Sequence, residues 1–264
     1  MITSKSNPRI KNLIRLQKSN ERRKQQRTLI EGYREIERAL ISGWKPETLF
    51  VSAEIAGTRM EQLIRLLPDE CETVFLSREV FEHIAYREGS DGILAVCEPI
   101  QLSLDEIQTG LNPLIIVLES VEKPGNMGAI LRTADAVSAD AVIVCEPGTD
   151  LYNPNTIRAS LGCIFSVPFT SCSSEEALRW LRSKQCRIYA TTPESSTDYL
   201  DMDFTGPTAL VMGSEATGLT DFWIKNADKH IRIEMEGIAD SLNVSVATAV
   251  IAFESKRQKK VKNI

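Results

Sequence analysis

Histidine is nearly absent from this 264-residue chain, which contains only His83 and His230. The six cysteines are scattered along the chain without any C-x-x-C pair. Zinc sites in proteins are built mainly from cysteine and histidine at short spacings, so we expect no metal site. A free cysteine in an apolar run behaves as a small hydrophobic residue. We therefore expect reduced cysteines in a cytoplasmic protein.

Long apolar runs are also missing. The longest ones, such as residues 113–118 and 141–145, are far shorter than the ~20 residues that a membrane-spanning helix needs. No apolar segment follows the first basic residues, so the N-terminus does not have the pattern of a signal peptide. Hydrophobic and charged residues make up 42% and 25% of the chain, which is ordinary for a soluble globular protein.

The chain lacks the motifs of the common nucleotide-binding loops. Residues 213–218 (GSEATG) have the two glycines of a phosphate loop, but Leu219 and Thr220 follow where that loop needs lysine and serine or threonine. No G-x-G-x-x-G sequence occurs anywhere in the chain. These absences disfavour a nucleotide triphosphatase and a dinucleotide-binding enzyme.

Charge is distributed unevenly along the chain. The overall net charge is −5, but residues 1–30 carry +8, residues 254–264 carry +4, and the segment between them carries −17. Basic charge gathered in one segment can bind nucleic acid even in an acidic protein. The alternative is a solvated basic helix and a solubilising tail.

Strand-like and helix-like segments alternate along the chain, which predicts an α/β architecture. Residues 4–26 are predicted to form a basic helix, and short strands and helices follow it as far as residue 96. Proline, glycine and asparagine interrupt the pattern between residues 98 and 113. We therefore expect a small N-terminal α/β domain over residues 1–105 and a second domain over residues 106–264.

The second domain contains continuous apolar runs, which are typical of strands that are covered on both faces. The predicted strands are 114–118, 141–145, 187–190 and 209–212, and the predicted helices are 128–137, 155–161, 175–184 and 241–257. This order indicates a mostly parallel sheet. Ligands bind such sheets at the carboxyl ends of their strands.

Three stretches of small and polar residues are predicted to lie at that edge of the sheet. They are 126–134 (NMGAILRTA), 213–219 (GSEATGL) and 241–245 (SLNVS). Buried polar groups are costly unless they are hydrogen-bonded, so the three stretches indicate one composite pocket. Arg132 has few polar neighbours on its helix, and a guanidinium suits a phosphate or a carboxylate.

Together, these stretches resemble the motifs of the SpoU-type RNA ribose 2′-O-methyltransferases of the SPOUT superfamily. The similarity covers residues 112–258, and it extends more weakly to the N-terminal domain through 29–32 (LIEG) and 92–96 (GILAV). The resemblance implies a trefoil knot in the second domain, an RNA-binding N-terminal domain, S-adenosylmethionine as methyl donor, and a homodimer. It implies catalytic roles for Asn126, Arg132, Glu215, Ser241 and Asn243, and cofactor contacts from Thr191, Gly213, Ile233, Met235 and Leu242.

The resemblance favours 2′-O-methylation of ribosomal RNA. A transfer RNA 2′-O-methyltransferase is one alternative, and a non-catalytic RNA-binding or ribosome assembly factor is another. For the enzyme, we expect Arg132 to position phosphate or the 2′-oxygen rather than to accept a proton, because arginine is effectively always protonated.

Overall fold

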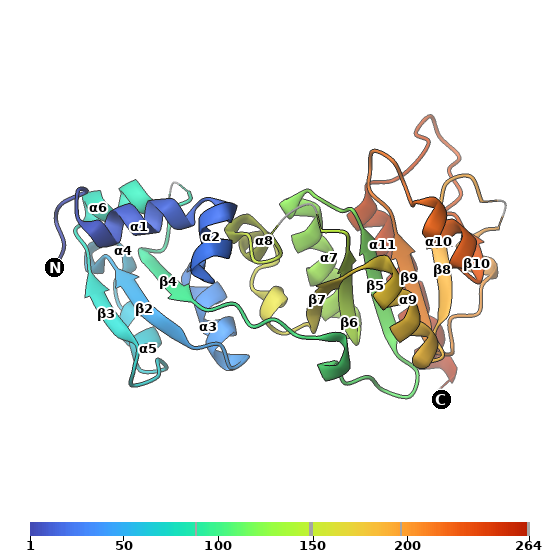
Figure 1. Cartoon of the computed structure of the whole chain (residues 1–264), viewed down its shortest axis with the longest axis horizontal. Coiled ribbons are helices and arrows are strands. Elements are labelled where there is room, and N and C mark those ends of the chain that lie inside the picture. Colours follow the sequence, from blue (N-terminus) through green and yellow to red (C-terminus); the bar gives the residue numbers. More distant parts are fainter. Residues whose placement is uncertain (88, 148–149, 196, 263–264) are drawn as a thin grey trace. The chain divides into compact units, whose positions relative to one another are not determined.

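The computed structural model describes residues 1–87, 89–147, 150–195 and 197–262. Its backbone forms two compact units, coloured from blue to red along the chain in Figure 1. The first unit comprises Met1–Ile100 and Tyr152–Ser166, and the second comprises Gln101–Leu151 and Val167–Ile264. The segment Tyr152–Ser166 thus packs with the N-terminal unit, although both of its flanking segments belong to the second.

The first unit is built on a four-stranded mixed sheet with the order β1-β4-β2-β3. β4 pairs antiparallel with both β1 and β2, and β3 pairs parallel with β2. The strands are β1 (Thr28–Glu31), β2 (Pro46–Val51), β3 (Glu72–Phe75) and β4 (Ile93–Cys97). The helices are α1 (Pro8–Leu16), α2 (Ser19–Gln25), α3 (Tyr33–Ile41), α4 (Ala53–Ala56), α5 (Arg59–Ile64), α6 (Arg78–Ile84) and α8 (Pro154–Ala159).

The N-terminal segment forms two helices, where the sequence predicted a single helix over residues 4–26. The chain leaves the helical conformation at Lys18, which has φ −93° and ψ 135°. The buried Arg22 donates from Nη1 to the carbonyl oxygens of Leu16 and Gln17, each at 2.8 Å, and so satisfies the end of α1. The apolar face of α1 lies in the core of the unit, with Ile10 and Leu13 at most 2% exposed.

The second unit is built on a six-stranded sheet with the order β10-β8-β9-β5-β6-β7, in which every neighbouring pair is parallel. The strands are β5 (Leu114–Glu119), β6 (Ala141–Cys145), β7 (Phe169–Cys172), β8 (Arg187–Thr191), β9 (Thr208–Met212) and β10 (Lys229–Ile231). The predicted mostly parallel sheet and its four central strands are confirmed. The two edge strands, β7 and β10, were not predicted.

Helices of the second unit cover this parallel sheet, as Figure 1 shows. They are α7 (Pro124–Val137), α9 (Ser174–Ser183), α10 (Asp221–Asn226) and α11 (Val244–Lys262). β5, β6 and β9 are buried along their whole length. Burial on both faces explains why their sequences are continuously apolar rather than alternating.

The predicted start of the last helix at Ser241 is wrong, because α11 begins at Val244. The side-chain oxygen of Asn243 accepts from the backbone N–H of Ser245 at 3.0 Å. This is the hydrogen bond of a helix cap, so Asn243 ends the preceding loop. α11 then packs against α7. None of the helices in the described part of the chain combines the length and the apolar character needed to cross a membrane.

A candidate active site at the carboxyl edge of the parallel sheet

The candidate residues follow neighbouring strands at the edge where those strands end. β5 lies next to β9, and β9 lies next to β8. β5 ends at Glu119, and β9 ends at Met212, which is paired in register with Thr191 at the end of β8. Because parallel strands end at the same edge of a sheet, the loops that follow β5 and β9 meet there.

The structure brings three of the predicted catalytic residues into direct contact. Asn126 Nδ2 donates to Glu215 Oε1 at 2.5 Å, and Asn243 Nδ2 donates to the same oxygen at 2.7 Å. Asn243 Nδ2 also lies 3.2 Å from Asn126 Oδ1, which accepts from it. A carboxylate and two amides from three separate segments, namely the first turn of α7, the turn after β9 and the loop before α11, thus form one hydrogen-bonded cluster, which we call the amide–carboxylate cluster.

Lys123 is a member of this site that the sequence did not reveal. It precedes α7, and its ammonium group donates to Glu215 Oε2. This hydrogen bond is the main reason that the pKa of Glu215 lies below its usual value, and the amide of Asn126 contributes in the same direction. Glu215 is consequently held as a carboxylate with both oxygens accepting hydrogen bonds.

The loop that carries Glu215 is a tight turn that depends on Gly213. Ser214 and Gly218 exchange backbone hydrogen bonds of 3.2 and 3.0 Å, and the Ser214 hydroxyl accepts from the N–H of Thr217 at 3.1 Å. A Cβ atom on Gly213 would lie 2.3 Å from the carbonyl carbon of Gly218 and 2.5 Å from its oxygen. Because these neighbours are backbone atoms, only glycine fits at this position.

A buried carboxylate fixes the far end of the same loop. Glu119, the last residue of β5, is 2% exposed. Its two oxygens accept from the backbone N–H and the hydroxyl of Thr220, each at 2.7 Å. In the sequence Glu119 directly follows an apolar run that predicts a strand. Nothing near it in the sequence indicates that it would bind Thr220, which lies 101 residues further along the chain.

Two predicted catalytic residues do not join the cluster. Arg132 is exposed on α7, six residues after Asn126, and forms no hydrogen bond or ion pair with the residues that the structure describes. Six residues correspond to about 240° around a helix, so Arg132 lies on a different side of α7 from Asn126. Ser241 is exposed, and its side chain likewise has no partner within the described ranges.

The predicted cofactor residues lie on and beyond three adjacent strands, β10, β8 and β9. Thr191 ends β8, Gly213 follows β9, and Ile233 lies two residues beyond β10. Ile233 and Met235 are partly exposed, and Leu242 is 36% exposed. Gly213 follows the carboxyl end of β9 along the chain, and Ile233, Met235 and Leu242 follow that of β10. A parallel sheet binds its ligands at the carboxyl ends of its strands.

Two buried polar atoms near this edge have no protein partner among the described residues. They are Oγ1 of Thr191 and Nε of Arg232. A buried polar atom without a hydrogen-bond partner destabilises the fold. A bound ligand with polar groups would supply the missing hydrogen bonds to these two atoms. In the same described ranges, no group of three or more histidine, cysteine, aspartate or glutamate side chains has an arrangement that could hold a metal ion.

Comparison with known proteins identifies the family. The model of the SpoU rRNA Methylase family matches residues 113–253, and the model of the MRM3-like substrate binding domain matches residues 7–95. The chain belongs to the SpoU rRNA methylase family. The predicted family and the α/β fold class are confirmed.

Individual relatives match along most of the chain. A 23S rRNA (guanosine-2′-O-)-methyltransferase of Ralstonia nicotianae is 34% identical over 80% of this chain and 81% of its own length. An RNA 2′-O ribose methyltransferase of known structure is 39% identical, with a TM-score of 0.86, and covers 98% of this chain and 99% of its own. An AdoMet-bound rRNA methyltransferase from Sinorhizobium meliloti is 30% identical, has a TM-score of 0.89 and covers 97% of each chain.

Proposed function

We propose that this chain transfers a methyl group from S-adenosylmethionine to a ribose 2′-hydroxyl of ribosomal RNA. The observation that carries the proposal is the amide–carboxylate cluster of Asn126, Glu215 and Asn243, assembled from three separate segments at the ligand-binding edge of a SpoU-type sheet. The relatives described above act on RNA riboses or ribosomal RNA, which supports this substrate.

S-adenosylmethionine supplies, when bound, an electrophilic methyl group attached to a positively charged sulfur. Gly213, Ile233, Met235 and Leu242 would hold it, and the unpartnered hydroxyl of Thr191 would donate or accept one hydrogen bond. The tight turn after Gly213 keeps backbone polar groups at the strand end without a side chain in the way. An AdoMet-bound relative supports this assignment.

The amide–carboxylate cluster would orient the target ribose. Glu215 accepts from both amides and from Lys123, so the first turn of α7, which carries Asn126, and the loop that carries Asn243 are fixed with respect to each other. Its lowered pKa makes Glu215 a weak base. We therefore assign Glu215 the role of positioning the two amides rather than of accepting the hydroxyl proton. Correct placement of two reacting groups can itself contribute about 7–11 kcal/mol to catalysis.

Arg132 would bind the RNA backbone. Its guanidinium is exposed and has no partner among the described residues, so it is free to make bidentate contacts with a phosphate. Since arginine stays protonated at working pH, its charge also favours an oxygen that develops negative charge. Ser241, exposed in the loop before Asn243, would contact the same ligand.

A second copy of the chain would complete the site. One face of α11 carries apolar side chains that are exposed in the single chain, with Val246 47% and Phe253 53% exposed, while the helix packs on α7 elsewhere. Leu242 precedes this helix and is 36% exposed. Exposed apolar patches of this kind mark association surfaces. We propose a homodimer through this face, a trefoil knot in the second unit, and action in the cytoplasm.

A binding and product assay tests the function. Calorimetry with S-adenosylmethionine should give saturable binding, and ATP should give none. Ribosomal RNA treated with the enzyme should yield one 2′-O-methylated nucleoside by mass spectrometry. A methylated base would contradict the ribose assignment, and a product in transfer RNA alone would replace the substrate.

A further inference from the structure

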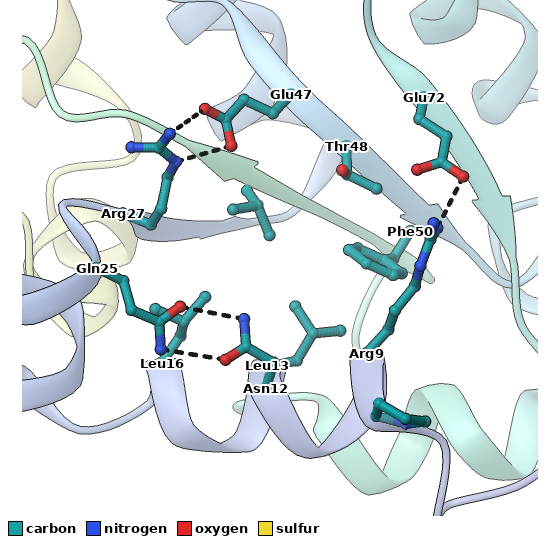
Figure 2. A pocket seen from close by; sticks show the side chains of 12 residues that line it. Arg9, Asn12, Leu13, Leu16, Gln25, Arg27, Glu47, Thr48, Phe50 and Glu72 are labelled. Atoms are coloured by element: carbon teal, nitrogen blue, oxygen red, sulfur yellow. Dashed lines mark hydrogen bonds and ion pairs between the residues drawn. The ribbon is translucent and has the colours of Figure 1, made fainter.

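A groove in the first unit has the size and lining of a small-ligand site. It measures about 560 Å³ and lies between α1, α2 and one face of the mixed sheet. Figure 2 shows the side chains that line it. Sites for small ligands commonly have volumes of about 300–1,000 Å³.

The floor of the groove is apolar and lies on the sheet. Thr48 and Phe50 are two residues apart on β2, and Val96 on β4 is paired in register with Thr48, so all three lie on the same face of the sheet. Phe50 on the sheet and Leu13 and Leu16 of α1 also border the groove, but they are at most 4% exposed, so the half-buried Thr48 and Val96 provide the accessible part of its floor. An apolar floor of this kind suits the flat face of a base better than it suits a charged group.

The middle of the groove presents a pair of side-chain amides. Asn12 Nδ2 donates to Gln25 Oε1 and Gln25 Nε2 donates to Asn12 Oδ1, both at 3.1 Å, as the two parallel dashed lines in Figure 2 show. Gln25 Nε2 also donates to Glu21 Oε2 at 3.0 Å, so both of its protons are engaged. Asn12 Nδ2 retains one proton and both amide oxygens can accept a further hydrogen bond, so the pair can also bind the edge of a nucleobase.

Ion pairs at the two ends of the groove neutralise the two carboxylates that line it, Glu47 and Glu72. Glu47 accepts from Arg27 at 2.7 Å through each of its oxygens, and Arg27 also donates to the carbonyl of Gln26. At the other end Arg9 contacts Glu72 through a single nitrogen, at 2.7 Å, and its side chain is 52% exposed. Arg27 is therefore fully engaged, whereas Arg9 retains nitrogens for a phosphate.

The surroundings of the groove select an anionic ligand. Five further basic residues on α1 and α2 or between them are exposed: Lys11, Arg15, Lys18, Arg23 and Lys24. Their field attracts phosphate and gives sequence-independent affinity, whereas an apolar floor with amides reads a base. RNA-binding proteins recognise mainly unpaired bases that can be turned out of a helix.

We propose that this groove binds one unpaired nucleotide of the RNA substrate, with the base on the half-buried side chains of Thr48 and Val96, its edge on Asn12 and Gln25, and its phosphate at Arg9. The inference rests on the proposed function, since it takes RNA as the substrate. It places a second recognition point on the N-terminal unit, separate from the ribose that is methylated.

To test the proposal, a larger side chain is substituted into the groove. Binding of the full chain to an in vitro transcript of large-subunit ribosomal RNA is then measured at several salt concentrations. Thr48→Trp should weaken binding at least 10-fold and lower the slope of log K against log salt by no more than about one, because the base contact and the single phosphate contact at Arg9 are lost while the other phosphate contacts remain. Ile41→Trp, at a neutral and 78% exposed position at the end of α3, is the matched control and should leave binding unchanged. Lys11→Gln should instead lower the slope by about one.

Asn12→Leu provides a second variant that leaves the sheet untouched, and it should weaken binding about 5- to 10-fold. Affinity within twofold of the unmodified chain for both variants, or a loss in Thr48→Trp that comes with a salt slope lower by two or more, would overturn the groove proposal. The two failures are distinguishable. If the unmodified chain methylates ribosomal RNA while both variants bind normally, only the groove is wrong; if it methylates no RNA, the proposed function is wrong.

Discussion

The amide of Asn243 donates to the Glu215 carboxylate at 2.7 Å while the side-chain oxygen of Asn243 accepts from Ser245 and caps α11. One residue thus joins the turn that carries Glu215 to the start of the helix that packs on α7. The two halves of its amide have separate tasks, and a substitution can remove one of them alone.

Asn243→Asp keeps the cap but places a second carboxylate against Glu215. We expect thermal stability to change little, since aspartate is as good a cap as asparagine. Methyl transfer should fall about 10- to 100-fold, because a hydrogen bond to a charged group contributes about 1.5–3 kcal/mol. Asn20→Asp, which makes the same charge change in the first unit, is the control. Equal turnover for Asn243→Asp and the control would refute the positioning role.

Lys123→Met should raise the pKa of Glu215 toward its ordinary value, because the hydrogen bond from Lys123 is the main cause of the lowered pKa. A carboxyl whose pKa is lowered by folding stabilises the fold above its unfolded pKa, and that contribution is lost as the pH falls through the folded value. As the pH is lowered, the variant should therefore protonate Glu215, and lose the stabilisation that this carboxylate provides, at a higher pH than the unmodified chain. Carbon-13 NMR titration of the carboxyl, assigned with Glu215→Gln, measures this shift. An unchanged pKa would show that the ion pair does not hold the charge.

Gly213→Ala should open the turn that carries Glu215, since the new Cβ would lie 2.3 Å from the Gly218 carbonyl carbon. We expect S-adenosylmethionine to bind at least 10-fold more weakly in calorimetry, with a melting temperature lower by a few degrees. Gly206→Ala is the control, because a Cβ there meets nothing within 4 Å. Tight cofactor binding by Gly213→Ala would remove this turn from the proposed cofactor site.

Glu119→Gln should destabilise the second unit, because the buried carboxylate loses charge-assisted hydrogen bonds to Thr220. The expected cost is about 1–3 kcal/mol in the free energy of unfolding. Thr220→Val and the double variant complete a double-mutant cycle measured by urea unfolding. Strictly additive losses would mean that the two side chains do not interact.

The sequence predicted the central strands and the meeting of Asn126, Glu215 and Asn243, because each follows an apolar strand or opens a helix at one edge of a parallel sheet. The edge strands were missed for a physical reason. β7 contains the polar residues Thr170 and Ser171, and β10 has three residues, of which only Ile231 is buried. Neither has the continuous apolar run that marks a strand covered on both faces.

The roles of Lys123 and Glu119 could not be read from local patterns. A lysine beside the first turn of a helix and a glutamate at the end of a strand are both common, and what distinguishes these two is a partner about one hundred residues away. The start of α11 was misplaced because Ser241, Asn243 and Ser245 are all residues that cap helices. Only the backbone decides among them.

The most direct test of the central claim uses tritium-labelled S-adenosylmethionine with ribosomal RNA that lacks modifications, and transfer RNA in parallel. The unmodified chain should label one ribosomal RNA fragment, at a linkage that resists alkali as a 2′-O-methylated ribose does, and Asn243→Asp should reduce the rate of labelling at least 10-fold. Label in transfer RNA alone, label on a base, or no label despite cofactor binding would contradict the account.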